Sequence, residues 1–397
     1  MGEALTCTLG EAVMVIYLDH AATTPMLPAV VDAYVGALPV VGNPSSIHSQ
    51  GQNAKRMLEE AREAVALSVG ADSVEVTFTS GGTEAINLAL KGLFWARAPR
   101  NRILATRAEH HATIDALEWL QQHEGAVIDW VPVSDTGLID LDYLNAALGN
   151  DVALVTTLWA NNEVGTLQPV RGVADLAAAH GVPVHADAVS AYGYLQVDFP
   201  SSGLAALSIS AHKIGGPMGI GALVIARSAT VTPLFHGGSQ QRARSGTMDV
   251  AGSVAFGAAA SMIESDQSRL VALRDRLVDG VAVEVPSAIL RGDPVHRLPG
   301  NAHFTFPGCE GDSLLFLLDV AGFSVSTGSA CQAGVPEASH VLLAMGLDEP
   351  TARGALRITL GHATTVAEVD AFLAALPDAV ARARDAGYAD REPHLGH

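Results

Sequence analysis

Cysteine is scarce in this sequence, which has three in 397 residues, Cys7, Cys309 and Cys331. They are too few and too widely separated for the disulfide framework of a secreted domain or for a CxxC metal site. We therefore expect no structural metal and a reducing compartment, and we predict a cytoplasmic protein.

Positive charge is also scarce: 23 Lys and Arg residues stand against 42 Asp and Glu residues, for a formal net charge of -19. Such a thin distribution leaves no basic stripe that could follow a phosphate backbone, which argues against nucleic acid as a partner. The N-terminus lacks a basic segment followed by a long apolar run, so it is neither a signal peptide nor a membrane anchor. We expect residues 1–13 to be a disordered extension.

The chain does contain enough apolar residues for a large core, 49% of the total. From residue 74 onward, short apolar runs alternate with segments of helical period, a pattern typical of βαβ units around a mostly parallel sheet. We predict strands over 74–80, 102–106, 127–133, 152–160, 183–189, 206–210 and 221–226, and helices over 82–96, 111–122, 141–148 and 173–181.

The pattern changes near residue 265. A glycine- and alanine-rich helical stretch that begins at Val250 is followed by shorter strands in HFTFPGC and FSVST. We therefore predict an α/β protein with a large domain at 31–265 and a smaller α+β domain at 266–397. We expect residues 14–30 to join the smaller domain.

Lysine is as rare as cysteine, and one lysine stands where an apolar strand ends. Lys213 follows the strand predicted at 206–210 and precedes a turn of glycines and proline, and Lys55 and Lys91 are the others. A lysine in this position pairs with a carboxylate, reaches the surface, or stays neutral for Schiff-base chemistry. For an isolated lysine the first two alternatives are favoured, so the residues near Lys213 must indicate whether the third, Schiff-base chemistry, applies.

Asp187 ends the strand before that of Lys213, in the segment VHADAVS. An acid there can supply the counter-charge that keeps a pyridine nitrogen protonated, which pyridoxal phosphate requires to act as an electron sink. Alone, Asp187 is as readily a helix N-cap. The spacing of Asp187 and Lys213 fits the ends of adjacent strands, and as a pair they predict a cofactor site.

The turn Ser80-Gly81-Gly82-Thr83 offers a phosphate cradle, because the helix predicted after it has free N–H groups and a dipole that favour an anion. By itself the turn is weak evidence, and it lacks the GK[ST] ending of a nucleotide P-loop. The AEHHA segment follows the next strand, and one of its imidazoles could lie against a pyridine ring and move protons. Either histidine could instead be a surface or capping residue, which we favour for His111.

Cys331 lies in STGSACQAG, a run of small residues without apolar periodicity that predicts an exposed loop. A loop cysteine among serine and glycine can act as a nucleophile, whereas Cys309, beside Glu310, is consistent with buried packing. With a thiol pKa of about 8.5, only a few per cent of a free cysteine is ionised at neutral pH. Cys331 therefore needs a base to react quickly.

Together these motifs resemble the cysteine desulfurases of the NifS/IscS type, which are fold type I pyridoxal-phosphate enzymes of the class V aminotransferase group. The resemblance implies a large domain with a mostly parallel seven-stranded sheet flanked by helices, and a smaller α+β domain that carries the Cys331 loop. The matching segments follow in order through nearly the whole chain: YLDHAATTP (17–25), GNPSSIH (42–48), TSGGTE, EHHA, ANNEVG, HADA, SAHKIGGP, RSGT, STGSAC and ALRITLG (355–361).

The resemblance implies a residue for each part of the cofactor, pyridoxal 5'-phosphate. Lys213 would hold it covalently and later move protons at the substrate Cα, Asp187 would pair with the ring nitrogen, and His110 would stack on the ring. Thr247 of RSGT would reach a cofactor phosphate across a subunit interface, which implies a homodimer. The remaining phosphate ligands would be Gly82, Thr83, Ser210 and His212.

The implied substrate is L-cysteine. Asn162 and Arg357 would hold it, with the guanidinium gripping its carboxylate through two hydrogen bonds. Cys331 would attack the sulfur of the cofactor-bound cysteine, leaving a persulfide on the enzyme and releasing alanine. The small-residue loop is similar to that of the group I type, which hands sulfur directly to an acceptor protein. The product sulfur would serve iron-sulfur clusters, tRNA thiolation or a dedicated biosynthetic pathway.

Two features depart from the family pattern. Where similar enzymes carry a glutamine that bonds the phenolic oxygen of the cofactor, this chain has Ser190, a shorter group that needs water to reach it. The HGGSQQRARSGT segment is shorter than its counterpart and lacks a Glu-Arg pair, which alters the dimer-side wall of the site.

Two alternatives to the desulfurase are open. One is a selenocysteine lyase or other C–S lyase on the same scaffold, for which the Ser190 change is the hint. The other is a non-catalytic scaffold for sulfur transfer, which the altered HGGSQQ segment suggests. A scaffold needs none of the reactive residues that this chain retains, namely Lys213, Asp187, His110, Cys331 and Arg357.

Overall fold

The structure is a computed structural model that describes residues 15–328 and 338–389. Its central sheet has seven strands, β2 (Val76–Thr79), β3 (Arg102–Thr106), β4 (Val127–Val131), β5 (Val152–Leu158), β6 (Val184–Asp187), β7 (Ala206–Ser210) and β8 (Gly221–Ile225). They are ordered β2-β8-β7-β6-β5-β3-β4, and only β8 runs antiparallel to its neighbours in this sheet. The predicted α/β class, with a mostly parallel seven-stranded sheet, is confirmed.

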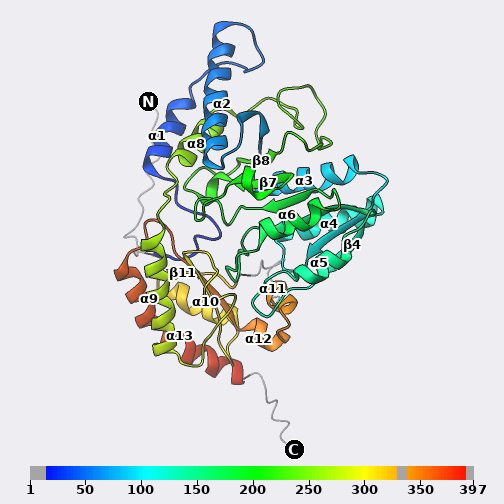
Figure 1. Ribbon diagram of the computed structural model, residues 1–397. Helices are drawn as coiled ribbons and strands as arrows, with labels where there is room; N and C mark the ends of the chain where they lie inside the picture. The colour runs from blue at the N-terminus through cyan, green and yellow to red at the C-terminus, as the bar shows by residue number, and fades with distance from the viewer. Residues whose placement is uncertain (1–14, 329–337, 390–397) are drawn as a thin grey trace, which may run out of the picture.

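Helices cover both faces of this sheet (Figure 1). Along β7, Ala206 belongs to the core under α3 and α4, whereas Leu207 and Ile209 belong to the core on the opposite face. Because both faces are covered, central strands such as β5 and β7 are buried at every residue. The flanking helices are α3 (Gly82–Ala96), α4 (His111–Glu124), α5 (Leu141–Ala147), α6 (Val170–Ala178) and the short α7 (Phe199–Ser202).

Three further helices, α1 (Pro28–Ala37), α2 (Ser49–Ser68) and α8 (Val250–Ser261), pack together beside the sheet (Figure 1). The chain therefore returns after residue 250 to helices that form near its N-terminus. The helices α2 and α8 approach closely at Gly257, where a Cβ atom would stand 2.9 Å from the Cα of Ala61. The small residues of the α8 sequence permit this contact.

A second core surrounds a three-stranded antiparallel sheet in the order β12-β10-β9. The strand β1 (Ile16–Tyr17) pairs in parallel with β11 (Phe323–Ser324), so the start of the described chain packs into this smaller α+β unit. The other strands are β9 (Ile289–Leu290), β10 (Asn301–Thr305) and β12 (Ala355–Thr359). The helices in this part of the chain are α9 (Ser268–Glu284), α10 (Gly311–Val320), α11 (His340–Ala344), α12 (Glu349–Arg353) and α13 (Val366–Ala389).

Most of the predicted elements form, with shifts at their ends. The strands predicted at 102–106 and 206–210 and the helix predicted at 82–96 match at both ends. The strand predicted from residue 74 begins later, at Val76, because Ser73–Glu75 form a 3-10 turn. The helices α1 and α2 were not predicted, and the expected disordered extension at 1–13 lies outside the described residues.

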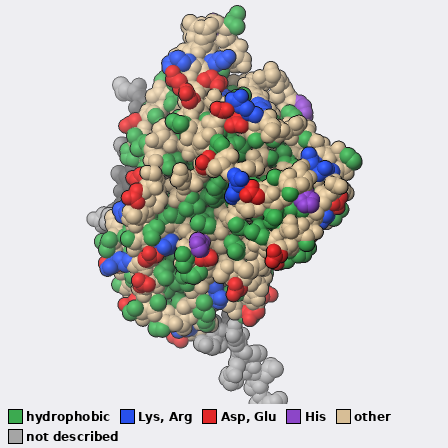
Figure 2. All heavy atoms as spheres, viewed as in Figure 1, with side chains coloured by type: hydrophobic (Ala, Val, Ile, Leu, Met, Phe, Trp, Pro, Cys, Tyr) green, Lys and Arg blue, Asp and Glu red, His purple; other side chains and the backbone are tan. Residues whose placement is uncertain are grey.

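Charge is dispersed over the surface. Figure 2 shows Lys and Arg side chains as separate groups on the visible face, several of them next to acidic side chains. Exposed ion pairs along helices include Arg56–Glu60 and Arg353–Glu349. No helix within the described ranges, 15–328 and 338–389, is long and apolar enough to cross a membrane.

We expect Gly257→Val to destabilise the protein, because the added side chain would meet the backbone of Ala61 and push α8 away from α2. Overpacking of this kind costs about 1–3 kcal/mol, which should lower the midpoint of thermal unfolding by several degrees. Gly36→Val in α1 is the control, because, apart from its chain neighbours and the backbone of its own helix, no described heavy atom lies within 4 Å of the Cβ that it adds. A Gly257→Val protein that melts at or above the wild-type temperature would contradict this account.

Candidate active site

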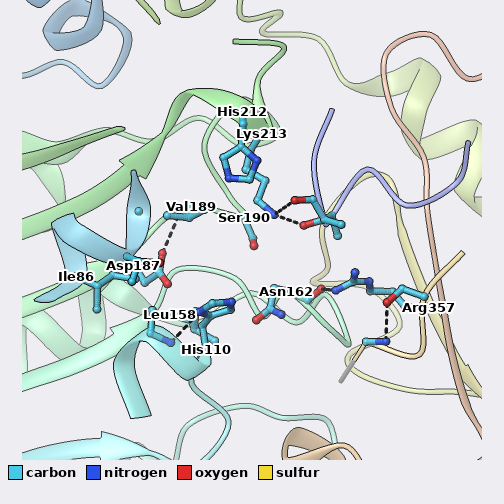
Figure 3. Close-up of a pocket in the computed structure, with 17 residues that line it drawn as sticks. Ile86, His110, Leu158, Asn162, Asp187, Val189, Ser190, His212, Lys213 and Arg357 are labelled. Atoms are coloured by element: carbon cyan, nitrogen blue, oxygen red, sulfur yellow. Dashed lines mark hydrogen bonds between the residues drawn. The ribbon is translucent and has the colours of Figure 1, made fainter. Parts of the chain in front are cut away.

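A cavity of about 370 Å³ opens at the carboxyl ends of the central strands, where ligands of open α/β sheets bind. In Figure 3, Asp187 and Arg357 lie at opposite sides of this cavity, with Lys213 and His110 between them in the view. The predicted site residues found in its wall are Gly82, Thr83, His110, Asn162, Asp187, Ser190, His212, Lys213 and Arg357.

Lys213 lies in the short 3-10 turn Ala211–Lys213, directly after β7. Its amine donates hydrogen bonds to the carbonyl oxygen of Ala21 and, at 3.0 Å, to that of Ala22 (Figure 3). Burial, together with the nearby Arg357 guanidinium, lowers the pKa of this amine from 10.5 to about 8, although the Asp19 and Asp187 carboxylates oppose the shift. Much of the amine is therefore neutral near pH 8, which is the form that reacts with an aldehyde.

Asp187 is the last residue of β6 and is 3% exposed. Burial raises the pKa of its carboxyl to about 6, while the N–H of Val189, at 2.9 Å, and the Lys213 amine oppose this rise. The carboxyl is therefore mainly ionised at neutral pH and can balance a cation. The alternative that Asp187 caps a helix does not hold, because Val189, whose N–H donates to the Asp187 carboxyl, lies in a turn and not in a helix.

The phosphate cradle forms where the turn after β2 enters α3, whose first residue is Gly82. A Cβ atom at Gly82 would stand 2.7 Å from Cγ2 of Val189, so the absence of a side chain is required here. Ser210 lies beside this turn, with its Cβ 3.8 Å from the Cβ position of Gly82. Its hydroxyl is buried without a hydrogen-bond partner in the described part of the chain. The helix N-terminus and this free donor suit an anion.

His110 is the N-cap of α4, where its Nδ1 accepts a hydrogen bond from the N–H of Ala112 at 3.0 Å. His110 therefore takes the capping role, whereas His111, which we expected to be a surface or capping residue, is the first residue of the helix and is partly exposed. Burial in the cavity wall, with the charge of Lys213, lowers the pKa of the His110 imidazole to about 4. The ring is neutral, with its proton on Nε2, and it is open to the cavity. His111 instead lies against His340, with 4.6 Å between the ring centroids.

Arg357 lies on β12 and is 5% exposed. Its guanidinium pairs with the Asp19 carboxylate at 2.9 Å and donates to the Asn162 carbonyl oxygen at 3.0 Å. Two polar atoms here, Nε of Arg357 and Oδ1 of Asn162, are buried without partners within residues 15–328 and 338–389. The free Nε–H of Arg357 can therefore still donate to an anion such as a carboxylate, and the free Asn162 oxygen can accept from a donor group of the same ligand.

The sequence analysis missed two acidic residues of this region, Asp19 and Glu109. Asp19 stands in the quoted YLDHAATTP motif, and its position there was the available signal. Glu109 is 1% exposed, and burial raises the pKa of its carboxyl to about 8, although the Thr106 hydroxyl donates to it at 3.0 Å. Because Glu109 is then mainly neutral at pH 7, Asp187 is the ionised member of this buried pair.

Two predicted residues that the structure describes are not part of the cavity wall. Ser210 lies behind it, as described above, and Thr247 is exposed and does not line it. Cys331 falls in 329–337, outside the described residues. Ser326 and Gly328, which precede that segment, do line the cavity.

The residues present fit pyridoxal phosphate. An amine of lowered pKa, an ionised acid, a neutral imidazole and an anion cradle with a free Ser210 hydroxyl lie around one cavity. Those groups match the aldehyde, the ring nitrogen, the ring face and the phosphate of that cofactor. The cavity volume also lies within the range of small-molecule sites, about 300–1,000 Å³.

Comparison with known proteins agrees with this fit. The model of the family Aminotransferase class-V matches residues 16–372. An IscS-like cysteine desulfurase of Mycobacterium tuberculosis (strain ATCC 25618 / H37Rv) is 52% identical over 386 residues, which are 94% of this chain and 98% of that protein. A solved NifS-like protein has a TM-score of 0.86 at 33% identity, covering 93% of this chain and 100% of that one. A structure of SspA in complex with cysteine has a TM-score of 0.78 at 30% identity, covering 87% and 98%.

These findings confirm the resemblance and the predicted cofactor. Proteins of this family that resemble NifS and IscS use pyridoxal 5'-phosphate, for which the cavity provides the groups described above. The match extends through both the large sheet and the smaller α+β unit. The chain therefore belongs to the class-V aminotransferase family, among its cysteine desulfurases of the NifS/IscS type.

Proposed function

We propose that this protein is a pyridoxal-phosphate-dependent cysteine desulfurase that converts L-cysteine to L-alanine and receives the sulfur as a persulfide on Cys331. One observation carries the proposal: a single cavity holds Lys213, with its lowered amine pKa, the ionised Asp187, and Arg357. This combination suits an amino acid whose carboxylate binds the guanidinium. A complex of one structural relative with cysteine supports the choice of substrate.

Each residue has a role that follows from its protonation state. When bound, the cofactor supplies the electron sink that makes the substrate Cα–H acidic. Lys213 would hold it covalently and, as a neutral amine, take and return the Cα proton. Asp187 would balance the protonated ring nitrogen, and His110 would lie against the ring as a neutral imidazole. Arg357 and Asn162 would hold the substrate.

The sulfur step needs no external oxidant. The Cys331 thiolate would attack the substrate sulfur, so that an S–S bond forms while the C–S bond breaks. The carbon that loses sulfur takes up a proton and becomes the methyl group of alanine, which balances cysteine plus thiol against alanine plus persulfide. The persulfide sulfur would pass to an acceptor protein for iron-sulfur clusters, tRNA thiolation or a dedicated biosynthetic pathway.

We also propose a homodimer that acts in the cytoplasm. Thr247 is exposed and lies outside the cavity wall of its own chain, which supports a contact with the phosphate in the partner subunit. The segment before it is tied to the phosphate cradle, because Arg244 pairs at 3.0 Å with Glu84 in the first turn of α3.

For the domain organisation we propose a large cofactor-binding domain at 31–265 and a small domain at 266–397. Residues 14–30 would belong with the small domain, which the pairing of β1 with β11 supports. The two hydrophobic cores described above, one around each sheet, support a division between them.

Cys331→Ala should reduce alanine formation from L-cysteine by about a hundredfold or more, because the sulfur acceptor of the first turnover is removed. Cofactor absorbance should be unchanged, and alanine should be quantified by chromatography. Cys309→Ala is the control, because Cys309 is 4% exposed and burial raises the pKa of its thiol. Unchanged turnover in Cys331→Ala would reject the persulfide mechanism and favour a C–S lyase.

Lys213→Ala should abolish both the absorbance of covalently bound cofactor and alanine formation, because no other lysine lines the described cavity wall. The measurement is the visible spectrum after addition of pyridoxal phosphate and removal of the free compound. Lys55→Ala, on the exposed face of α2, should retain both. A wild-type protein that stays colourless would overturn the enzyme and favour the non-catalytic scaffold.

The apoprotein should take up pyridoxal phosphate faster as the pH rises from 6 to 8 and then level off. The sign follows from Lys213: below its amine pKa of about 8, the reactive neutral fraction rises about tenfold per pH unit. Uptake should be followed by absorbance, with Lys213→Ala as the blank. A rate that continues to rise tenfold per unit up to pH 10 would indicate an ordinary lysine pKa and contradict the site electrostatics.

A further inference from the structure

The carboxylate of Glu163 lies beside the chain on both sides of the segment 329–337, which carries Cys331. Glu163 belongs to the turn after β5 and is 1% exposed. After the segment, the Ser339 hydroxyl donates a hydrogen bond to Oε2 of Glu163. Before the segment, a Cβ atom at Gly328 would stand 3.3 Å from the same oxygen. One carboxylate oxygen is therefore next to both flanking residues, Gly328 and Ser339.

Gly328 is closely surrounded at its position. Its φ of +87° is one that side-chain-bearing residues rarely adopt, and its N–H donates to the Ser326 hydroxyl at 3.0 Å. A Cβ atom here would also stand 3.3 Å from Nε2 of His303, a completely buried residue of β10. The backbone of Ser326 pairs with that of Arg357 on β12. The chain before the segment is therefore attached to β12 and packed against Glu163.

Ser339 holds the chain on the other side of the segment. Its side chain is completely buried, and its hydroxyl donates to Glu163 while it accepts from the N–H of Leu342 at 3.1 Å, which makes it the N-cap of α11. The next residue, His340, places its Nδ1 3.9 Å from Oε1 of Glu163, and its Nε2 bonds the Glu109 carbonyl oxygen at 2.8 Å. Hydrogen bonds to a carboxylate are among the stronger ones in proteins. The start of α11 is therefore fixed to Glu163.

The turn that carries Glu163 also belongs to the substrate end of the cavity. The carbonyl oxygen of Asn162, the preceding residue, accepts from the Arg357 guanidinium at 3.0 Å (Figure 3). The buried Asn161 side chain accepts from the N–H of Glu163 at 2.8 Å, and the Asn301 amide donates to the Glu163 carbonyl oxygen at 3.0 Å. These bonds fix the backbone of the turn. The same turn thus connects the proposed substrate-binding pair with both flanking residues.

We propose that Glu163 is a positioning residue for sulfur transfer: by holding Gly328 and Ser339, its carboxylate sets where the Cys331 thiol meets the substrate bound at Arg357. Glu163 is not part of the described cavity wall, so it acts through the chain and does not touch the substrate. Misplacing a reacting group by about 1 Å can lower a rate about a hundredfold. The effect on sulfur transfer rests on the proposed desulfurase function, whereas the anchoring of the flanking residues does not.

Hydrogen–deuterium exchange of the cofactor-loaded protein tests the anchoring without substrate. Glu163→Leu should raise exchange about five-fold in peptides that cover 326–328 and 339–343, because the carboxylate that holds both flanking residues is lost. Glu163→Gln should stay within about two-fold of the wild type, since it keeps an acceptor oxygen for the Ser339 hydroxyl. Exchange in Glu163→Leu that is unchanged at either flank would overturn the proposal.

Ser339→Ala provides a second variant that leaves Glu163 in place. It removes the contact with the carboxylate and also the cap of α11. Asp348→Ala is the matched control, because Asp348 caps the neighbouring α12 by accepting from the N–H of Thr351 at 2.8 Å and has no bond to Glu163 among the described residues. Both variants lose the cap of a short helix, and only Ser339→Ala loses the proposed anchor.

Single-turnover measurements test the positioning role. After L-cysteine is added, the persulfide on Cys331, detected by mass spectrometry after alkylation with iodoacetamide, should form about tenfold more slowly in Glu163→Leu and Ser339→Ala. Asp348→Ala should match the wild type. Affinity for L-alanine, measured by cofactor absorbance, should stay within about two-fold in all variants, because the Arg357 side chain is unchanged.

Persulfide formation in Ser339→Ala or Glu163→Leu at the rate of Asp348→Ala would overturn the positioning role. A slower rate accompanied by an equal loss of L-alanine affinity would overturn it as well, because the damage would then lie in the substrate site. A wild type that forms no persulfide would reject the proposed function, while the exchange measurements would still decide the anchoring.

Discussion

The removal of a buried amine and a buried acid from water is the constraint on which the rest of the site depends. Desolvation disfavours the charged form of each, and it brings the pKa of Lys213 down to about 8 and that of Asp187 up to about 6. The amine is then partly neutral, and the acid remains ionised at neutral pH. On the surface Lys213 would stay protonated, so the helices that exclude water from the sheet support the chemistry as well as the stability.

The parallel sheet brings the groups together, and the smaller unit completes the site. Because parallel strands end at one edge, Asp187 at the end of β6 and His110 after β3 reach the same cavity. Arg357 arrives on β12 of the other sheet, and its guanidinium is held at 2.9 Å by Asp19, which follows β1. Asp19, near the start of the described chain, thus orients the Arg357 guanidinium, the group proposed to bind the substrate. The carbonyl oxygens of Ala21 and Ala22 hold the Lys213 amine.

Local patterns made much of this predictable. The helix 82–96 begins at a glycine pair and has a clear apolar face, so its limits could be predicted from the sequence. A role that depends on a distant contact could not be predicted in this way. Asp19 was missed because its partner Arg357 is 338 residues away along the chain. The sequence did not decide which of His110 and His111 caps the helix, because only the backbone at the start of α4 determines that His110 makes the cap.

The sequence by itself determined the family, the order of the strands and helices around the sheet, and the chemical types of the groups that reach the cavity, because residue type and order along the chain carry that information. Only the tertiary structure decided the protonation states of those groups, since a pKa shift depends on burial and on charges brought near by folding. It also decided which residues line the main cavity, because residues from distant parts of the sequence meet there only after folding.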